Sequence, residues 1–266
     1  ARVELKPAGV AFHTRAVEPA IAADVTASVL TGVGAMAGVR WDRTTNELDD
    51  DLRIGGIDRS GDADYEKATA RLGLTWNPGR KVGLYASWGQ GFLPPATEEL
   101  ANNPSALGGF NEGLVPATSN GVEVGARGSL LPSLSYDVAF FHLRTEDDFG
   151  RYRVPTRPLE TFYGNLGATR RWGVETSVGW LPAPGLDVQL AWTWSRFKYT
   201  DVSSLFGSYS DTFMPNVPEH QLYVDVEYSP LPSLAVGASA DVVTRWAIDP
   251  SNQTWVGGYT LLNARA

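Results

Sequence analysis

The feature that most constrains the fold of this chain is an alternation of apolar and polar residues that returns along most of its length. Leu186, Val188, Leu190, Trp192 and Trp194 take every second position of one such segment. Successive side chains of a β-strand leave opposite faces, so a period of two predicts strands with one apolar and one polar face. The polar positions carry full charges in mid-strand. The pattern therefore predicts an all-β fold, an antiparallel up-and-down transmembrane barrel with its apolar face toward lipid.

Composition excludes several other classes of protein. The chain has 266 residues, a net charge of −8 and no cysteine, so disulfide scaffolds and thiolate metal sites are ruled out. The negative charge argues against nucleic acid as a partner. Because no run of about 18 apolar residues occurs, the sequence predicts no transmembrane helix.

The connections between the predicted strands alternate between short and long. The short ones are rich in Pro, Gly or Asn and lie at 77–80, 131–133, 182–185 and 230–233. The long polar ones lie at about 46–63, 93–117, 146–160, 200–217 and 248–254. This alternation predicts a meander with all short turns at one rim. We expect one domain, residues 1–266, with about twelve strands at roughly 2–13, 19–29, 35–45, 64–76, 81–92, 118–130, 134–146, 160–181, 186–199, 218–229, 234–247 and 255–264.

Acids and bases mix on the predicted lumen face. The strand alternation assigns to this face Arg71, Glu123, Arg127, Arg171, Glu175, Asp225, Asp241 and Arg245. The alternation assigns five apolar residues to the face that meets lipid: Val122, Val174, Leu190, Val224 and Val242. The lumen charges are interpreted as pairs across neighbouring strands or against a plug.

The sequence offers little for catalysis. Its three histidines are His13, His142 and His220, and neither a Gly-x-Ser-x-Gly elbow nor a His-Glu-x-x-His motif occurs. The acidic stretch Glu146–Asp148 is interpreted as a solvated loop tip rather than a Ca²⁺ site. We therefore predict no catalytic residue, no metal site and no cofactor.

Five motifs appear in one order along residues 33–266. Leu84-Tyr-Ala-Ser-Trp-Gly-Gln-Gly-Phe-Leu-Pro-Pro95 resembles the "LYASYGxGFRPP" strand of TonB-dependent outer-membrane receptors. Three further resemblances to this family are the segment from Leu114 to Gly125, the segment from Tyr163 to Glu175, and Val217-Pro218-Glu219-His220. The last is Gly258-Tyr-Thr-Leu-Leu-Asn263, which matches "GYxLxN".

The resemblance implies a barrel of roughly 22 strands with a plugged lumen, of which this chain would form about twelve strands near the C-terminal end. The plug domain, its energy-coupling box and the final strands would lie outside this sequence. A passive porin-like channel and an outer-membrane barrel enzyme are the alternatives. The plug separates receptor from porin, and catalytic geometry around His142 would be needed for an enzyme.

The resemblance also implies a function and partners. The function is energy-dependent uptake of a ferric siderophore or similar metal chelate across the outer membrane of a Gram-negative bacterium. The partners are the chelate, the TonB energy-transducing complex acting through the missing plug, and outer-membrane lipid and lipopolysaccharide.

Long loops would capture the ligand. Loop 146–160 holds Arg151, Tyr152, Arg153 and Arg157, which suit an anionic chelate by charge and cation–π contact. Because this loop follows a strand that runs away from the short turns, it is predicted to be extracellular. The aromatic residues of loop 200–217 are further candidates: Phe206, Tyr209 and Phe213. The alternative is that these loops are solvated and pair only with one another.

Overall fold

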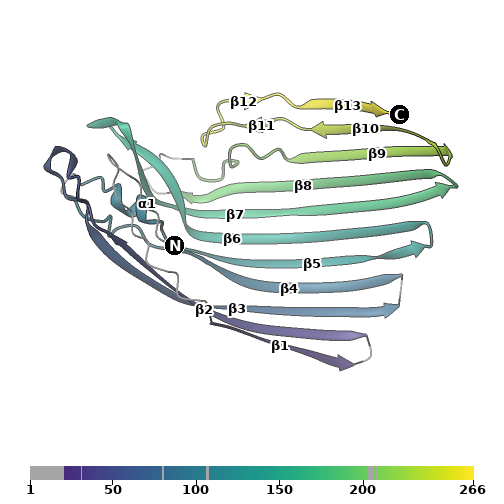
Figure 1. The fold of residues 1–266 in the computed structure, drawn as a ribbon, viewed down its shortest axis with the longest axis horizontal. Helices are drawn as coiled ribbons and strands as arrows, with labels where there is room; N and C mark the ends of the chain where they lie inside the picture. Colours follow the sequence, from purple (N-terminus) through teal and green to yellow (C-terminus); the bar gives the residue numbers. More distant parts are fainter. Residues whose placement is uncertain (1–20, 31, 80, 106–107, 203–206, 208) are drawn as a thin grey trace.

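An open antiparallel sheet of eleven strands forms most of the molecule in the computed structural model (Figure 1). The structure describes residues 21–266 apart from 31, 80, 106–107, 203–206 and 208. The strand predicted at 2–13 lies outside the described residues. The strands of the sheet follow in chain order, and β1 and β13 form its two edges.

The sheet contains β1 (Ile21–Leu30), β2 (Val33–Leu48), β3 (Gly61–Gly79), β4 (Val82–Leu93), β5 (Ala117–Leu131), β6 (Leu134–Val154), β7 (Arg157–Ala183), β8 (Leu186–Val202), β9 (His220–Leu231), β10 (Leu234–Val243) and β13 (Tyr259–Arg265). A separate pair consists of β11 (Trp246–Ala247) and β12 (Trp255–Val256). The helical elements are the 3-10 turn Ile54–Gly56 and α1 (Thr97–Ala101). None of the described helices has the length and apolar composition to cross a membrane.

The predicted meander is confirmed. Every strand pair in the sheet is antiparallel, and the short turns β3–β4, β5–β6, β7–β8 and β9–β10 lie together at the right-hand rim in Figure 1. The connections of β2–β3, β4–β5 and β8–β9 lie at the opposite rim and are long. We call this second rim the long-loop rim.

One predicted loop is wrong. Residues 146–160 are not a loop, because β6 continues to Val154 and β7 begins at Arg157, which leaves a two-residue turn. The two strands stay paired through Arg151–Tyr163 and Tyr152–Phe162. Aromatic residues with high strand propensity stand opposite each other here and outweigh the charges that suggested a loop. The strand predicted at 234–247 also ends early, at Val243.

The strand register divides the sheet into two chemically different faces. Residues directly opposite each other in an antiparallel pair share a face, and one continuous row joins Arg71, Gly89, Gly121, Leu143 and Arg171. We call the face of this row the polar face. Stepping by two along each strand places on it Arg71, Glu123, Arg127, Arg171, Glu175, Asp225 and Asp241. Arg245 follows the end of β10, so the register does not assign it to a face.

The opposite face, which we call the apolar face, is exposed and hydrophobic. Leu72 and Leu74 are each 52 % exposed and Val124 is 49 % exposed. In a soluble protein, so large an uncovered apolar surface would cause aggregation. Four tryptophans of β7 and β8 lie on this face: Trp180 nearest the short turns, then Trp192 and Trp194, and Trp172 nearest the long-loop rim. An exposed apolar band bordered by Trp180 and Trp172 fits a wall that meets hydrocarbon.

Glycines on the polar face make room for aromatic rings of neighbouring strands. A methyl group added at Gly173 would meet the backbone carbonyl of Trp194 and the ring of Phe141. The Phe141 ring itself packs edge-on against Phe197, with 6.2 Å between ring centres.

We expect Gly173→Ala to lower the free energy of unfolding by about 1–3 kcal/mol, because β8 must move away from β7 to admit the methyl group. The measurement is urea unfolding of the barrel in lipid vesicles. Gly79→Ala is the matched control, since a methyl group there meets nothing within 4 Å. Equal losses for the two variants would contradict the tight contact.

Candidate functional site

The segment between β4 and β5 folds back onto the sheet at the long-loop rim. Its helix α1 and the residues after it bury Leu100, Phe110 and Leu114, which pack together with Leu48 at the end of β2. Tyr65 of β3 borders this cluster, and by its register with Arg71 it belongs to the polar face. We call residues 94–116 the cover loop, because its described residues, which exclude 106–107, lie against the polar face near the long-loop rim.

Two hydrogen bonds of the Asn46 side chain fix the start of the cover loop. Asn46 of β2 is 4 % exposed, donates from its side chain to the carbonyl of Pro95, and accepts a hydrogen bond from the Thr97 hydroxyl. The Glu99 carboxylate accepts a hydrogen bond from the backbone N–H of Ala96, which supports the first turn of α1.

Asn165 of β7 holds the end of the cover loop. Its side-chain oxygen accepts from the backbone N–H of Val115 at 2.9 Å, and its side-chain nitrogen donates to the carbonyl of Val115 at 2.8 Å. An amide side chain in this arrangement imitates one step of strand pairing. The same nitrogen also donates to the carbonyl of Asp147. The structure therefore gives a physical reason for the asparagine of the Tyr163–Gly167 motif, because it joins the β7 strand to the cover loop.

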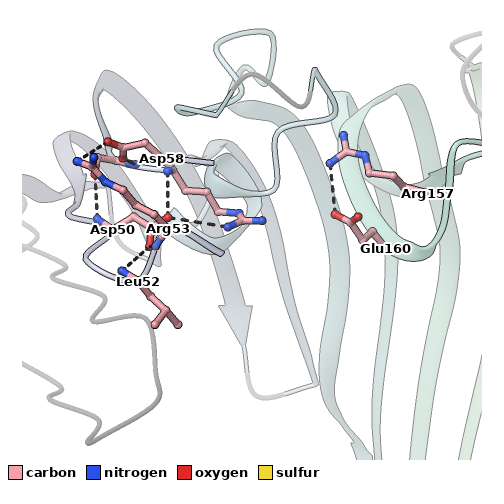
Figure 2. A network of polar contacts seen from close by, with 8 residues as sticks. Asp50, Leu52, Arg53, Asp58, Arg157 and Glu160 are labelled. Carbon is pink, nitrogen blue, oxygen red and sulfur yellow. Dashed lines mark hydrogen bonds and ion pairs between the residues drawn. The ribbon is translucent and has the colours of Figure 1, made fainter. Parts of the chain in front are cut away.

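Arg157 anchors the middle of the cover loop from the β6–β7 hairpin. Its guanidinium donates to the carbonyl oxygens of Asn103 at 3.3 Å and Pro104 at 2.5 Å, and lies 4.5 Å over the ring of Phe162. Glu160 pairs with it at 3.3 Å (Figure 2). These contacts use most of the donors of Arg157 inside the protein.

A neighbouring loop, between β2 and β3, is organised around a buried carboxylate. Asp50 is 3 % exposed and accepts hydrogen bonds from the backbone N–H groups of Leu52, Arg53 and Arg59. Arg53 also pairs with Asp58 at 2.9 Å (Figure 2). The pKa of the Asp58 carboxyl is lowered, chiefly by hydrogen bonds from the hydroxyl and the backbone N–H of Ser60. Both carboxylates therefore serve the loop's own folding.

A second, partly buried network lies on the polar face next to the cover loop. Arg171 donates to Asp148 at 2.5 Å and to the hydroxyl of Thr145 at 3.1 Å, and Thr169 donates to the same carboxylate at 3.0 Å. Thr169 is fully buried. Arg171 of β7 therefore pairs with a carboxylate of the neighbouring strand β6.

The hairpin residues predicted to capture ligand differ in their surroundings. The Arg151 guanidinium lies 5.6 Å over the ring of Tyr163, and Tyr152 packs against Phe162 with 6.0 Å between ring centres. Arg151 and Arg153 are exposed. Arg157 does not join them in an open cluster, because its guanidinium is turned into the cover loop.

The predicted aromatic residues after β8 are separated. Phe206 lies outside the described residues. Tyr209 packs edge-on against Tyr199 at 5.4 Å, and burial raises the pKa of its phenol. The backbones of Phe213 and Lys198 form an isolated antiparallel β-bridge. Two cations lie over the Phe213 ring, Arg196 at 5.7 Å and Lys198 at 5.1 Å from the ring centre. No common aromatic pocket forms among the described members of this set.

The sequence analysis missed the residues that hold the cover loop: Asn46, Leu100, Phe110, Asn111, Leu114 and Asn165. One signal was present, since Leu100, Phe110 and Leu114 are large apolar residues inside a segment interpreted as polar. Asn165 stood in a family motif, but neither it nor Asn46 revealed its role, because their partners are backbone groups about 50 residues away.

The loop between β11 and β12 depends on one carboxylate. Asp249 accepts hydrogen bonds from the Ser251 hydroxyl and from the backbone N–H groups of Gln253 and Thr254. The Ser251 contact, followed by these N–H groups, lowers the pKa of Asp249 to about 2. Because the pKa falls on folding, the carboxylate stabilises the loop above the unfolded pKa of roughly 3.9.

We therefore expect loop 248–254 to stay closed at neutral pH and to open as the pH falls from about 4 through about 2. Hydrogen exchange at the Gln253 and Thr254 amides measures this opening. Asp249→Asn should give fast exchange at pH 7 and remove the acid transition, and an unchanged transition in that variant would contradict the assignment.

Metal and catalytic geometry is not seen in the described part of the chain. No three His, Asp or Glu side chains gather there in a way that suits a metal ion. His142 lies on the apolar face between Val122 and Trp172, and His220 stacks on Trp192 at 5.9 Å. These surroundings give neither histidine an arrangement for catalysis.

Comparison with known proteins identifies the family. Residues 19–266 match the family model described as "TonB dependent receptor-like, beta-barrel". The chain belongs to this family, a family of transport receptors rather than enzymes. Its place is the outer membrane of a Gram-negative bacterium, as predicted.

A curated relative and several solved structures agree with this assignment. The chain is 26 % identical over 170 residues to the probable TonB-dependent receptor BfrD of Bordetella pertussis, which covers 64 % of this chain and 22 % of the relative. The ferric yersiniabactin uptake receptor FyuA of Yersinia pestis has a TM-score of 0.71 at 19 % identity, covering 92 % of this chain and 37 % of that one. The copper transporter OprC has a TM-score of 0.73 at 13 % identity, with 91 % and 38 % covered. At these identities, the structural matches show the fold alone, and the chain spans well under half of each relative.

Proposed function

We propose that this chain forms the C-terminal part of the barrel of an outer-membrane receptor that takes up a ferric siderophore or a similar metal chelate. Uptake would be driven by the TonB complex acting through a plug domain encoded elsewhere in the protein. In this proposal the polar face lines the lumen and the apolar face contacts lipid.

The cover loop is the observation that carries this proposal. A passive pore needs an open lumen, whereas here the described residues of the cover loop lie on the polar face and are held by Asn46, Arg157 and Asn165. A covered lumen suits a receptor that binds its ligand from outside and opens only when energy is supplied. The names of the structural relatives, which include a ferric yersiniabactin uptake receptor and a ferric citrate transporter, support a chelated metal as ligand.

We propose that the ligand is met on the polar face beside the cover loop, with Arg151 and Arg153 as the first charged contacts. Both side chains are exposed at the long-loop rim. In a protein of net charge −8, a local positive focus of this kind attracts an anionic chelate. Tyr152, Tyr209 and Phe213 remain candidates for contact with an aromatic chelator, and Arg157 contributes by holding the cover loop in place.

The test of uptake uses the full-length receptor expressed in cells that lack other iron receptors. We expect accumulation of radioactive iron from ferric siderophores to require both this receptor and the TonB complex. Accumulation that persists after removal of TonB and follows the outside concentration would instead support a passive channel.

The test of the site is the double variant Arg151→Ala/Arg153→Ala. Because hydrogen bonds to charged groups contribute roughly 1.5–3 kcal/mol each, we expect the Kd of an anionic ferric chelate to rise by at least about tenfold at low ionic strength. Arg43→Ala is the control, since Arg43 is a rim arginine that pairs with Asp64 and lies on the apolar face. An unchanged Kd in the double variant would remove this pair from the site.

A further inference from the structure

A pocket lies on the polar face where β9, β10 and β13 approach the long-loop rim. Its volume of about 590 Å³ is in the range of small-molecule sites. The strand register places Gln221 and Tyr223 of β9, Asp241 of β10 and Tyr259 of β13 on this face, and all four line the pocket. The pair β11–β12 lies beyond the ends of β10 and β13, toward the same rim, and adds Trp246 to the lining (Figure 1). We call the space bordered by these five residues the amine pocket, for the reason given below.

The two connections above the amine pocket are tied together. The backbone N–H of Asn216, between β8 and β9, donates to the carbonyl of Ala247 in β11 at 2.8 Å. The hydroxyl of Thr244, just after β10, accepts from the backbone N–H of His220 at 3.0 Å and donates to its carbonyl at 3.3 Å. These contacts hold the connections against each other, so the pocket has a wall toward the rim as well as a floor on the sheet.

One carboxylate in the amine pocket has no partner in the described part of the chain. Asp241 is partly buried, and its carboxylate makes neither an ion pair nor a hydrogen bond with any described residue. Tyr223 stands directly opposite Asp241, but its hydroxyl donates to Asp225 at 3.3 Å. No Lys, Arg or His is among the described residues that line the pocket. The lining therefore carries a negative charge without an internal cation.

The neighbouring carboxylates of the same face do have a cation. Asp225 and Glu227 both pair with Arg265 of β13, at 2.7 Å and 3.0 Å. They lie closer to the short turns than Asp241, by one and two rows of the register. A carboxylate that is withdrawn from water needs a cation or several hydrogen-bond donors. Arg265 meets this need for its two partners, whereas Asp241 is left to a group from outside the described residues.

Aromatic rings surround this carboxylate. Trp246 and Tyr259 pack edge-on with 6.2 Å between ring centres, and Tyr223 is the third ring of the lining. The faces of such rings attract cations, above all ammonium groups. A carboxylate adds hydrogen-bond acceptors for the N–H groups of a protonated amine. One carboxylate, three rings and no cation in the described lining therefore favour a positively charged amine over a neutral or anionic group.

We propose that the amine pocket binds a protonated amine of the ligand. The inference rests on the proposed function, because it names a chemical group of the chelate that is taken up. Arg151 and Arg153 attract the anionic part from the β6–β7 hairpin, and β8 and β9 separate this hairpin from Asp241 on β10. A chelate that carries both charges is oriented by the two sites, and an analogue without the amine loses the second contact.

The experiment measures the binding of two small probes to the full-length receptor in a non-ionic detergent by saturation-transfer NMR. Phenethylamine is protonated at pH 7, and 2-phenylethanol is a neutral molecule of nearly the same size and shape. A hydrogen bond to a charged group contributes at least about tenfold in affinity. We therefore expect the Kd of the amine to be at least about tenfold lower than the Kd of the alcohol.

Asp241→Asn removes the charge with little change in volume. The Kd of phenethylamine should rise by at least about tenfold in this variant, and the Kd of the alcohol should stay within about twofold. Asp241→Glu keeps the charge and should keep the preference for the amine. Asp187→Asn is the matched control, since Asp187 is also a partly buried carboxylate of the polar face but lies near the short turns in β8. Its Kd for the amine should stay within about twofold, because a distant charge is screened.

The proposal fails if the two probes bind the unchanged receptor equally, if the amine does not bind, or if Asp241→Asn keeps the preference. The titration uses neither iron nor the TonB complex, so a negative result would leave the uptake proposal standing. Conversely, iron accumulation that does not depend on TonB would overturn the uptake proposal and leave the amine pocket in place.

Discussion

Leu100→Ala should release the cover loop from the sheet and cost about 2–5 kcal/mol of its local stability. Leu100 is completely buried in the cluster formed with Leu48, Phe110 and Leu114. Truncation of a buried leucine removes its transfer free energy and leaves a cavity. The cluster is small, so the cavity affects most of the apolar contacts that hold the loop. The backbone carbonyl of Leu100 also accepts a hydrogen bond from the backbone N–H of Asn111. The Asn111 side chain in turn donates to the backbone carbonyl of Tyr163 in β7.

Hydrogen exchange at the cover-loop amides in the full-length receptor measures this release. In Leu100→Ala, exchange should accelerate between 94 and 116 while β5–β8 stay protected. Leu159→Ala is the control, because Leu159 is 96 % exposed on the hairpin and its truncation leaves no cavity. Similar exchange in the two variants would mean that the polar clamps alone fix the cover loop.

Release of the cover loop should also change function. If the loop closes the lumen, Leu100→Ala should admit small hydrophilic antibiotics that the unchanged receptor excludes. Measurement of antibiotic sensitivity in cells that carry each variant tests this consequence. Leu159→Ala should leave sensitivity unchanged.

The strands of the sheet could be predicted because their signal is local. Alternation between Leu186 and Ser195 depends only on which face each residue meets, and the structure has β8 at Leu186–Val202. Turn-forming residue types such as Asn77 and Pro78, which lie at the end of β3, add a second local signal. The alternation thus predicted the fold class and the motifs predicted the family, and the family match confirms the family for residues 19–266.

The hairpin at the end of β6 could not be predicted in this way. Once the strands rise beyond the apolar band, both faces meet water, and charges such as Arg151 and Arg153 occur on a strand as readily as in a loop. The continued sheet is shown by cross-strand pairs in the structure, such as Arg151 with Tyr163 and Tyr152 with Phe162. The role of Arg157 was hidden for a related reason, since its partners are carbonyl oxygens of Asn103 and Pro104, more than 50 residues earlier.

The cover loop combines both difficulties. Its helix has five residues, too few for a periodic pattern, and its clamps are side chains of β2 and β7 that bind backbone groups. The alternation of the strands describes the wall of a barrel well. It carries no information about a loop that folds against the wall, and the candidate site lies where the two meet.

The orientation of the wall itself is tested by two arginine substitutions one strand apart. Val174 lies on the apolar face between Phe140 and Trp194, inside the band that separates Trp172 from Trp180. If this face meets hydrocarbon, Val174→Arg should reduce the free energy of folding into lipid vesicles by about 2–4 kcal/mol. The charge must either enter the hydrocarbon or draw water into it.

Thr193→Arg is the matched substitution on the polar face. Thr193 stands directly opposite Glu175, so the new guanidinium meets a carboxylate in a hydrated interior. We expect a change within about 0.5 kcal/mol, the range of an exposed ion pair less the entropy of ordering it. Urea unfolding in thin-bilayer vesicles compares the two variants. Equal losses would show that both faces meet the same environment. A greater loss for Thr193→Arg would reverse the assignment of the faces, along with the proposed position of the ligand.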